Sequence, residues 1–455
     1  MGLSGLDIYK LLPKTNCKEC GQPTCLAFAM KLAQKQAELS ACPYVSEQSK
    51  AALAAASAPP IRLVTVGTGE SKVEVGNETV LFRHEKTFFH PPGLFVRIKD
   101  TLPQAEADAL LNQITSFSVE RVGIKLRVHG VAIENASGDA AAFAARVAAV
   151  KAKTDLPLML IAATPQAMEA GLEQAAGVSP LIYAATAENW KEMAALAAKH
   201  KAPLAVRGQR SDPSGQGDLG ALAGLTEQIK AAGVEDMVLD PGVRTSHGTL
   251  IALTQLRRLA LKSGMRSLGY PIVTFPGENA SSVDEEVTRA AEHIAKYAGI
   301  IVLDHFEPAN VYPLLTLSQN IYTDPQKPIQ VSPGLYEISG PKPESPLLVT
   351  TNFSLTYFSV AGEVEGSGKP TWLLIVDSEG MSVLTGWAAG KFDAAKIAKS
   401  VNQFGVPGKV SHKKLVLPGL VAGLSGELEE ELPGWEIRVG PREAIDIPAY
   451  LKTWS

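Results

Sequence analysis

The chain has 455 residues, 45% of them hydrophobic and 20% charged, and a formal net charge of −4. This length exceeds one ordinary core and this composition is not that of a disordered chain, so we expect several globular domains. Lysine and arginine form no dense basic cluster, which argues against a nucleic-acid partner. The first residues lack the basic start and apolar core typical of a secretory signal, and no apolar run reaches ~18 residues, so we expect a cytoplasmic protein with no membrane partner.

All four cysteines lie near the start of the chain, in TNCKECGQPTC and SACPY. Their spacing is Cys17-x2-Cys20-x4-Cys25-x16-Cys42. Zinc sites more often show two close Cys-x2-Cys pairs, and disulfides are rare in a reducing cytosol. The pattern therefore favours an iron–sulfur cluster held by a domain over residues 1–58, with structural zinc and disulfides as the alternatives.

The next segment is expected to link this domain to the rest of the chain. A helix is predicted over residues 26–39, and the alanine-rich stretch at 50–60 ends in two prolines typical of a tether. The linker, residues 59–92, contains short strands. The last two, SKVEV and TVLFRHE, are predicted to form a hairpin around Gly76 and Asn77.

From residue 94 short apolar strands alternate with amphipathic helices. The strands read LFVRI, IKLRVHG, PLMLIAA, LIYAA, PLAVRG, MVLDPG, PIVTFPG and GIIVLDH. Eight β-α units in this order predict a TIM barrel over residues 93–321, which makes the fold class α/β. An open doubly wound sheet is the alternative.

Polar side chains stand at the ends of these strands, where a TIM barrel places catalytic residues. They are His129, Glu134, Arg207, Asp240, Glu278, Asn279, Asp304 and His305. No nucleophile and base have a recognisable spacing, and Asp-Pro-Gly is also ordinary turn chemistry. We interpret the barrel as a scaffold and docking surface, with a pterin-dependent methyltransferase as the rival hypothesis.

Six prolines between residues 322 and 346 form a bridge to a smaller α/β unit, so the last domain is placed at 322–455. The strands LLVTT, TWLLIVDS, KLVLPG and WEIRVG predict a flavodoxin-like or Rossmann-like sheet, whose ligands bind in loops at the strand ends. Glycines there allow close backbone approach, and Ser425 is predicted to cap a helix facing a phosphate; ordinary turns are the alternative. The candidate ligand residues are Thr351, Asn352, Ser354, Ser378, Thr385, Gly386, Gly419, Gly423, Ser425, Gly426, Gly440 and Pro441.

The segment KTNCKECGQPTCLAFAMKLAQ, the eight-unit barrel and the C-terminal α/β unit together resemble the large subunits of corrinoid iron–sulfur proteins of the reductive acetyl-CoA pathway. The resemblance covers essentially the whole chain. It implies that Cys17, Cys20, Cys25 and Cys42 hold a 4Fe-4S cluster. It also implies that the C-terminal domain holds a cobamide facing the barrel of a small subunit, in a heterodimer.

Cobalamin carriers often ligate cobalt through histidine in an Asp-x-His-x-x-Gly frame, but the only histidine in the last 150 residues, His412, lacks this frame. The resemblance implies a base-off, histidine-off cobamide whose Co(I) accepts methyl from methyltetrahydrofolate on a separate methyltransferase and donates it to acetyl-CoA synthase. The cluster, supplied by a low-potential electron donor, would return Co(II) to Co(I). The expected role is a methyl carrier within this system more than an enzyme, with a cobalt-free electron-transfer protein as another alternative.

Overall fold

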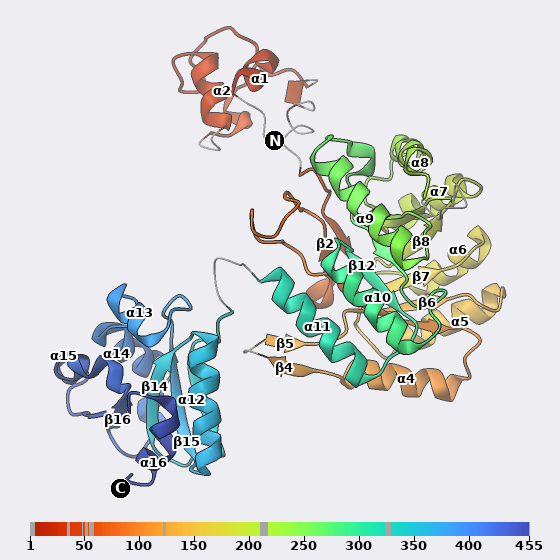
Figure 1. The fold of residues 1–455 in the computed structure, drawn as a ribbon. Coiled ribbons are helices and arrows are strands. Elements are labelled where there is room, and N and C mark those ends of the chain that lie inside the picture. Colours follow the sequence, from red (N-terminus) through yellow and green to blue (C-terminus); the bar gives the residue numbers. More distant parts are fainter. Residues whose placement is uncertain are drawn as a thin grey trace.

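The computed structural model describes residues 5–33, 37–47, 49–50, 53, 59–121, 124–209, 217–323 and 329–454. Figure 1 shows a small helical N-terminal domain, a barrel with helices around it, and a C-terminal α/β domain. Among the described residues, no helix is long and apolar enough to cross a bilayer. The predicted domain boundaries at 58/59 and 321/322 lie at or beside undescribed segments and stay predictions.

The N-terminal domain consists of α1 (Gly5–Leu11), α2 (Cys25–Ala33) and the 3-10 turn η1 (Leu39–Ala41). Phe28 is 1% exposed in its small core. The predicted helix over residues 26–39 is described as far as Ala33, and its last predicted residue already belongs to η1. Residues 34–36 lie outside the described part of the chain.

A short antiparallel hairpin precedes the barrel, formed by β1 (Val64–Val66) and β2 (Val73–Val75) around the 3-10 turn η2 (Gly69–Ser71). The prediction of a hairpin around Gly76 and Asn77 was therefore wrong. Both residues do have positive φ, 105° and 63°, but they serve a different contact. The Asn77 amide donates to the Ile61 carbonyl at 3.0 Å, and a Cβ on Gly76 would lie 2.0 Å from the Arg62 carbonyl oxygen. The glycine permits close packing rather than chain reversal.

The hairpin closes the amino-terminal end of the barrel. All four of its valines at the ends of β1 and β2 are buried and pack against inward-facing barrel side chains. The Gly67 amide donates to the Ser179 carbonyl, just before β8, at 2.9 Å. Apolar side chains thus fill this end, as expected for the stabilising face of a TIM barrel.

The barrel is an eight-stranded parallel sheet in the order β10-β9-β8-β7-β6-β3-β12-β11. A parallel bridge between Leu239 and Ile272 joins the outermost strands, and the Leu239 amide donates to the Pro271 carbonyl at 2.8 Å. The ring is therefore closed, so the TIM-barrel prediction is confirmed and the open sheet is wrong for this domain. The strands are β3 (Gly93–Lys99), β6 (Gly130–Glu134), β7 (Leu158–Ile161), β8 (Leu181–Ala185), β9 (Leu204–Arg207), β10 (Met237–Asp240), β11 (Val273–Thr274) and β12 (Ile300–Leu303).

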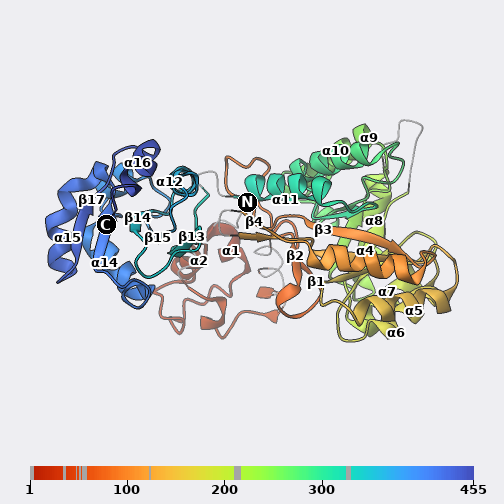
Figure 2. The same ribbon diagram turned by 90° about the horizontal axis from the view of Figure 1, so that it is seen from below.

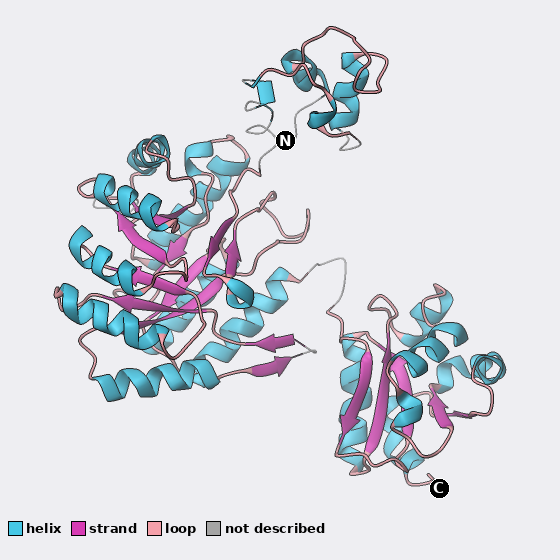
Figure 3. Cartoon of the chain, turned by 180° about the vertical axis from the view of Figure 1, so that it is seen from behind, coloured by secondary structure: helices cyan, strands magenta, loops and turns pink. Residues whose placement is uncertain are grey.

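Helices surround this ring, as Figure 3 shows from behind. Along each strand, alternate side chains face the barrel interior or the helix layer, so the apolar runs are buried on both faces. The helices are α4 (Gln104–Ser116), α5 (Ala140–Lys151), α6 (Pro165–Gln174), α7 (Trp190–His200), α8 (Leu219–Ala231), α9 (Ser246–Leu261), α10 (Val283–Ala295) and α11 (Pro308–Tyr322), with the 3-10 turn η3 (Arg266–Leu268) after α9.

The prediction that IKLRVHG forms the second barrel strand was wrong. Its first residues form β5 (Ile124–Leu126), which pairs antiparallel with β4 (Val119–Arg121) in a hairpin outside the ring. The barrel strand is the following segment, β6, which is buried along almost its whole length. Alternating apolar and charged residues are typical of a strand with one solvated face, whereas an uninterrupted apolar run is typical of a parallel barrel strand. Length and order alone did not distinguish the two segments.

His293 on α10 is a buried histidine that should make the barrel sensitive to acid. Its side chain is 3% exposed and neither ring nitrogen has a partner among the described residues. Burial, helped by Arg289 and Arg244, lowers its pKa to about 3. Because an unfolded histidine has a pKa of about 6.5, protons bind preferentially to the unfolded chain between these values, and stability falls as the pH falls below 6.5.

We therefore expect His293→Leu to remove about 2 kcal/mol of the stability difference between pH 7 and pH 5. Urea unfolding of the barrel at both pH values measures this difference. The exposed His247 offers a control, because His247→Leu should retain the wild-type pH dependence. Equal pH dependence in the two variants would contradict the assignment to His293.

The C-terminal sheet has the order β13-β15-β14-β16-β17, with β13 antiparallel and the other strands parallel. In chain order the four parallel strands are arranged 2-1-3-4, which is the flavodoxin-like order. The switch point of such a sheet lies between β14 and β16, where the connections leave in opposite directions. The strands are β13 (Gly334–Ile338), β14 (Leu347–Thr351), β15 (Thr371–Val376), β16 (Lys414–Leu417) and β17 (Glu436–Val439).

Helices cover both faces of this sheet, as seen from below in Figure 2. The proline-rich bridge is not all loop, because β13 lies within residues 322–346. Pro333 and Pro341 flank β13 without entering it, which suits an edge strand. The helices and 3-10 turns are α12 (Ser354–Ser367), α13 (Val383–Ala388), α14 (Ala394–Gln403), η4 (Val406–Gly408), η5 (Gly419–Leu424), α15 (Ser425–Glu431), η6 (Ala444–Asp446) and α16 (Ile447–Leu451).

Candidate functional site

The four cysteines lie within one small domain and all have free thiols. Cys25 and Cys42 are 6% and 4% exposed and belong to its apolar core, Cys20 is half-buried against that core, and Cys17 is exposed. Cys25 begins α2 and Cys42 directly follows η1. The fold thus brings the fourth cysteine back to the domain that holds the first three.

Asn16 fastens the cysteine loop to the start of α2. Its side-chain Oδ1 accepts from the Cys25 amide at 2.8 Å, and its own amide donates to Cys25 Sγ at 3.4 Å. The φ of Asn16 is 52°, a left-handed value that asparagine tolerates better than most residues. Sequence reasoning did not select Asn16; its place beside Cys17 and its left-handed preference were the available signals.

The thiols fit an iron–sulfur cluster by their chemistry. Four thiolates are the usual ligand set of a 4Fe-4S cluster, and N–H donation to sulfur is one of the factors that sets its potential. No group of three or more His, Cys, Asp or Glu side chains in the described part of the chain surrounds one point as the ligands of a single metal ion do. The ligands of an iron–sulfur cluster need not surround a single point, since each thiolate binds its own iron.

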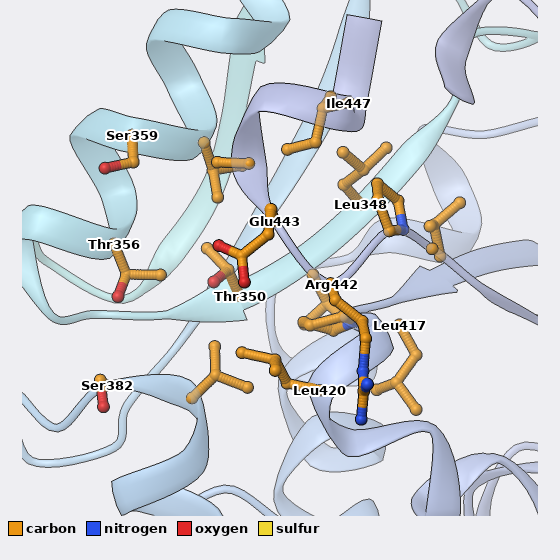
Figure 4. Close-up of a pocket in the computed structure, with 18 of the residues that line it drawn as sticks. Leu348, Thr350, Thr356, Ser359, Ser382, Leu417, Leu420, Arg442, Glu443 and Ile447 are labelled. Carbon is orange, nitrogen blue, oxygen red and sulfur yellow. The ribbon is translucent and has the colours of Figure 1, made fainter. Parts of the chain in front are cut away.

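A second feature is a cavity of about 360 Å³ in the C-terminal domain. It lies at the switch point, between the ends of β14 and β16, the first turns of α12, the start of α13 and the loop after β17. Its lining is largely apolar, with Leu348, Leu417 and Leu420 among the contributors. Figure 4 shows these side chains around the cavity.

The polar side chains that line this cavity are Thr350, Thr356, Ser359, Ser382, Arg442 and Glu443. Thr350 is 1% exposed, and its hydroxyl has no hydrogen-bond partner within the described residues. Arg442 and Glu443, in the loop after β17, add one charge of each sign, and Figure 4 places Glu443 beside Thr350. A buried hydroxyl without a partner is costly, and a bound molecule with a polar group would satisfy it.

Of the twelve predicted ligand residues, Gly440 and Pro441 line this cavity. Gly419 lies directly behind them: its amide donates to the Pro441 carbonyl at 3.0 Å, and a Cβ on it would lie 2.5 Å from the Gly440 carbonyl oxygen. Gly419 thus supports the cavity wall through its lack of a side chain. The predicted role in ligand binding stays a prediction for all three residues.

Asn352 and Ser378 form a hydrogen-bonded junction between β14 and β15. Asn352 Oδ1 accepts from the amide and the hydroxyl of Ser378, at 2.9 and 2.8 Å, and from the Gly380 amide at 3.0 Å. Its Nδ2 donates to Asp377 at 3.0 Å. These contacts position the loop after β15, so the two side chains act on the cavity through the backbone.

The other predicted residues lie around these groups without lining the cavity. Thr351 is fully buried on the face of β14 opposite Thr350, because successive strand residues alternate. The prediction that Ser425 caps a helix was wrong, since Ser425 is the first residue of α15 and Leu424 holds the cap position. Ser354 and Gly426 are at the starts of α12 and α15, Thr385 and Gly386 are in the middle of α13, and Gly423 is in η5.

His412 lies away from this cavity. Its Nε2 is 2.8 Å from the Ser345 carbonyl oxygen, and its Nδ1 accepts from the Lys414 amide at 3.1 Å. The ring also packs edge-on against Trp454. These contacts make it a structural histidine at the opposite end of the strands.

A domain with four free thiols, a closed β/α barrel and a flavodoxin-like domain with a cavity at its switch point define a multidomain α/β protein whose thiols and cavity belong to different domains. The family model described as CO dehydrogenase/acetyl-CoA synthase delta subunit matches residues 63–451, and the chain belongs to this family. A further model, described as a putative Fe-S cluster, matches residues 12–44, which contain all four cysteines.

Curated relatives match over nearly their whole length. The chain is 45% identical to the corrinoid/iron-sulfur protein large subunit of Moorella thermoacetica, covering 99% of both chains. It is 37% identical to the acetyl-CoA decarbonylase/synthase complex subunit gamma of Methanosarcina acetivorans, covering 99% of this chain and 98% of that protein. The resemblance predicted from the cysteine segment and the domain order is confirmed.

Solved structures of dihydropteroate synthase match part of the chain. The enzyme of Thermus thermophilus is 17% identical, covers 58% of this chain and 100% of its own, and has a TM-score of 0.40. The Yersinia pestis enzyme is 15% identical, with coverages of 50% and 94% and a TM-score of 0.38.

Proposed function

We propose that this chain is a methyl-group carrier that holds a cobamide in its C-terminal domain and a 4Fe-4S cluster in its N-terminal domain. One combination carries the proposal: four free thiols and a switch-point cavity in a chain 45% identical over its length to a corrinoid/iron-sulfur protein large subunit. When bound, the cobamide supplies a strongly nucleophilic cobalt that accepts methyl from methyltetrahydrofolate and yields it to acetyl-CoA synthase.

The cysteine domain would serve the cobamide by redox chemistry. Cys17, Cys20, Cys25 and Cys42 would hold the cluster, whose chemistry is one-electron transfer at low potential. The exposure of Cys17 favours electron entry from a donor protein at this side of the domain. The electron would serve to return Co(II) to Co(I), a repair that would not be part of every methyl transfer.

The C-terminal cavity would receive part of the cobamide. A cobamide is larger than about 360 Å³, so the cavity takes one portion of it and the apolar rim contacts another. Leu355 and Leu384 line the cavity, and we assign them to this rim together with Phe358 and Trp387 on the same two helices, α12 and α13; each of the four is 45% exposed or more. The described residues that line the cavity include no histidine, which fits a histidine-off cofactor.

The partners follow from the proposed chemistry. The word "large" in the name of the Moorella protein implies a small subunit there, and we propose one here that covers the apolar rim. A methyltetrahydrofolate methyltransferase, acetyl-CoA synthase and a low-potential electron donor complete the set. Each must reach the cobamide or the cluster in turn, which requires motion between domains.

Metal analysis and a transfer assay test this proposal. The chain, purified without oxygen together with its small subunit, should contain about four irons and one cobalt per chain. Given the methyltransferase, it should become methylated by methyltetrahydrofolate and then support acetyl-CoA synthesis. Iron without cobalt would indicate an electron-transfer protein, zinc alone a structural site, and methylation without added methyltransferase a barrel that acts as its own enzyme; each would overturn the proposal.

A further inference from the structure

The carboxyl-terminal end of the barrel contains a cavity that the proposed carrier function does not use. Its volume is about 410 Å³, and residues at the ends of β3, β6, β7, β8 and β9 line it. The hairpin valines fill the opposite end of the same barrel. One end is therefore packed and apolar while the other is open and polar, and TIM barrels bind their ligands at the latter.

Arg97 is at the base of this cavity. Its side chain is 6% exposed and contacts three carboxylates, one from each of three other strand ends. Its Nε donates to Asp304 at 2.8 Å, whereas its Nη1 lies 3.3 Å from Glu278 and 3.4 Å from Glu134. Glu134 has only this longer contact and is held loosely compared with Asp304, whereas Glu278 has a second arginine partner, Arg244.

Arg244 is the second arginine of this network, and it shares the Glu278 carboxylate with Arg97. Its Nη1 and Nη2 bind both oxygens of Asp240 at 2.9 and 2.7 Å, and it also donates to Glu278 and, at 3.0 Å, to the Tyr183 hydroxyl. Burial favours the neutral form of Asp240, but the Arg244 charge and its hydrogen bonds outweigh burial and lower the pKa of this carboxyl. Asp240 is therefore ionised at neutral pH.

The network contains more negative than positive charge. Two guanidinium groups face four carboxylates, those of Glu134, Asp240, Glu278 and Asp304. Buried charges give up hydration, and apolar side chains of similar volume would stabilise the barrel as well or better. The cavity lining itself has three glutamates and two arginines, and this excess of negative charge favours a ligand that donates N–H groups or carries positive charge over a plain anion.

Two side chains have free hydrogen-bonding capacity toward such a ligand. The Oε1 atom of Glu134 accepts no hydrogen bond from the described residues, and the side chain is 24% exposed. Arg207, three strands away at the end of β9, is exposed and makes no hydrogen bond or ion pair with any residue that the structure describes. Between them lie Ala162, Ala163 and Ala184, whose small side chains leave room for a flat group.

We propose that this cavity binds a small planar molecule with an amidine-type N–C–N edge, which donates to Glu134, and with an acceptor or anionic group that Arg207 binds. The carboxylate matches two parallel N–H donors, and the guanidinium matches a carboxylate or carbonyl. This site is separate from the cobamide cavity, so its failure would leave the carrier proposal untouched.

Three benzene-ring probes test the charge preference on the unmodified protein. The full-length, cofactor-loaded chain is dialysed to equilibrium against benzamidine, benzoate or 4-amidinobenzoate. Benzamidine should bind, its charge-reversed counterpart benzoate should not, and 4-amidinobenzoate should bind more tightly than benzamidine. Binding of benzoate as tight as that of benzamidine, or no binding of either amidine, would overturn the proposal.

Two variants test which side chain binds each end of the ligand. Glu134→Gln should weaken benzamidine binding by ~10-fold or more, the size expected for a charge-assisted hydrogen bond. Arg207→Met, at the exposed rim, should weaken 4-amidinobenzoate and leave benzamidine unchanged. Glu227→Gln, an exposed carboxylate on α8, is the matched control and should change neither. Wild-type affinity in Glu134→Gln would contradict the assignment.

The amidine edge has two natural sources, a guanidinium group or an aminopyrimidinone ring. Dialysis against L-arginine and against isocytosine separates them, with uracil as the ring that lacks the edge. Tighter binding of isocytosine than of arginine identifies a heterocycle, and the reverse order identifies a guanidinium; both agree with the proposal. Equal binding of uracil and isocytosine would show that the edge is not recognised and would overturn it.

Discussion

Replacing Cys20 by alanine is expected to abolish reductive reactivation while leaving methyl transfer from a loaded cofactor intact. One of four thiolate ligands is lost, so the cluster becomes incomplete or labile, whereas the ~360 Å³ cavity belongs to a different domain with its own core. We expect the rate at which a low-potential donor reactivates the Co(II) form to fall by at least ~100-fold. The reason is loss of the path for the electron, since binding of the cobamide is not affected.

The two activities are measured separately on the same preparation. The rate of methyl delivery to acetyl-CoA synthase is recorded after chemical methylation, and the appearance of Co(I) is followed by its absorbance after oxidation. Ser40→Ala, an exposed position of the same domain, is the control and should change neither rate. If Cys20→Ala instead releases the cobamide or unfolds the C-terminal domain, the cysteine domain is structural and the redox hypothesis is wrong.

Replacing Gly419 by alanine is expected to weaken cobamide retention by ~10-fold or more. The added Cβ would lie 2.5 Å from the Gly440 carbonyl oxygen, 2.9 Å from the Pro441 carbonyl carbon and 3.0 Å from the Arg442 amide. All three are backbone atoms, so the loop after β17, which forms the cavity wall, must move. Overpacking of this kind costs about 1–3 kcal/mol, and each 1.4 kcal/mol is a tenfold change in affinity.

Gly423 provides the matched control in the same segment. A Cβ at this position would meet nothing within 4 Å. The Gly423→Ala variant should therefore retain the cobamide, and its free energy of unfolding should be unchanged or slightly higher. Cobalt per chain after gel filtration, and the urea midpoint of the C-terminal domain, report the two effects. Equal cobalt loss in both variants would show that a general sensitivity of η5, not the contact behind the cavity wall, is responsible.

The C-terminal site was only partly predictable because a ligand cavity depends on which face each strand residue occupies. Two of the predicted residues, Gly440 and Pro441, line the cavity, but the sequence selected Thr351 where the structure places Thr350 at the cavity. The two are neighbours in LLVTT, and period-two alternation reverses with a shift of one residue. Leu417 and Leu420, which line the cavity, carried no chemical signal at all.

In the barrel, too, the sequence could not decide which of two segments forms a strand of the ring. Alternating β and α segments predicted eight units, yet the second strand was assigned to a segment that forms the outer hairpin β4–β5. Both segments are apolar enough to be strands. What separates them is pairing with residues far along the chain, as between β3 and β6, and no local propensity encodes such a partner.

By itself the sequence determined the cysteine spacing, the order of the domains and the family, because these depend on local residue types and on periodicity along the chain. Only the tertiary structure decided that the ring closes between β10 and β11, that valines of the hairpin fill one end of it, and that Arg97 meets carboxylates from three other strand ends at the other. Each of these features joins residues remote in sequence. Their proximity follows from how the whole chain packs, not from the residues beside them.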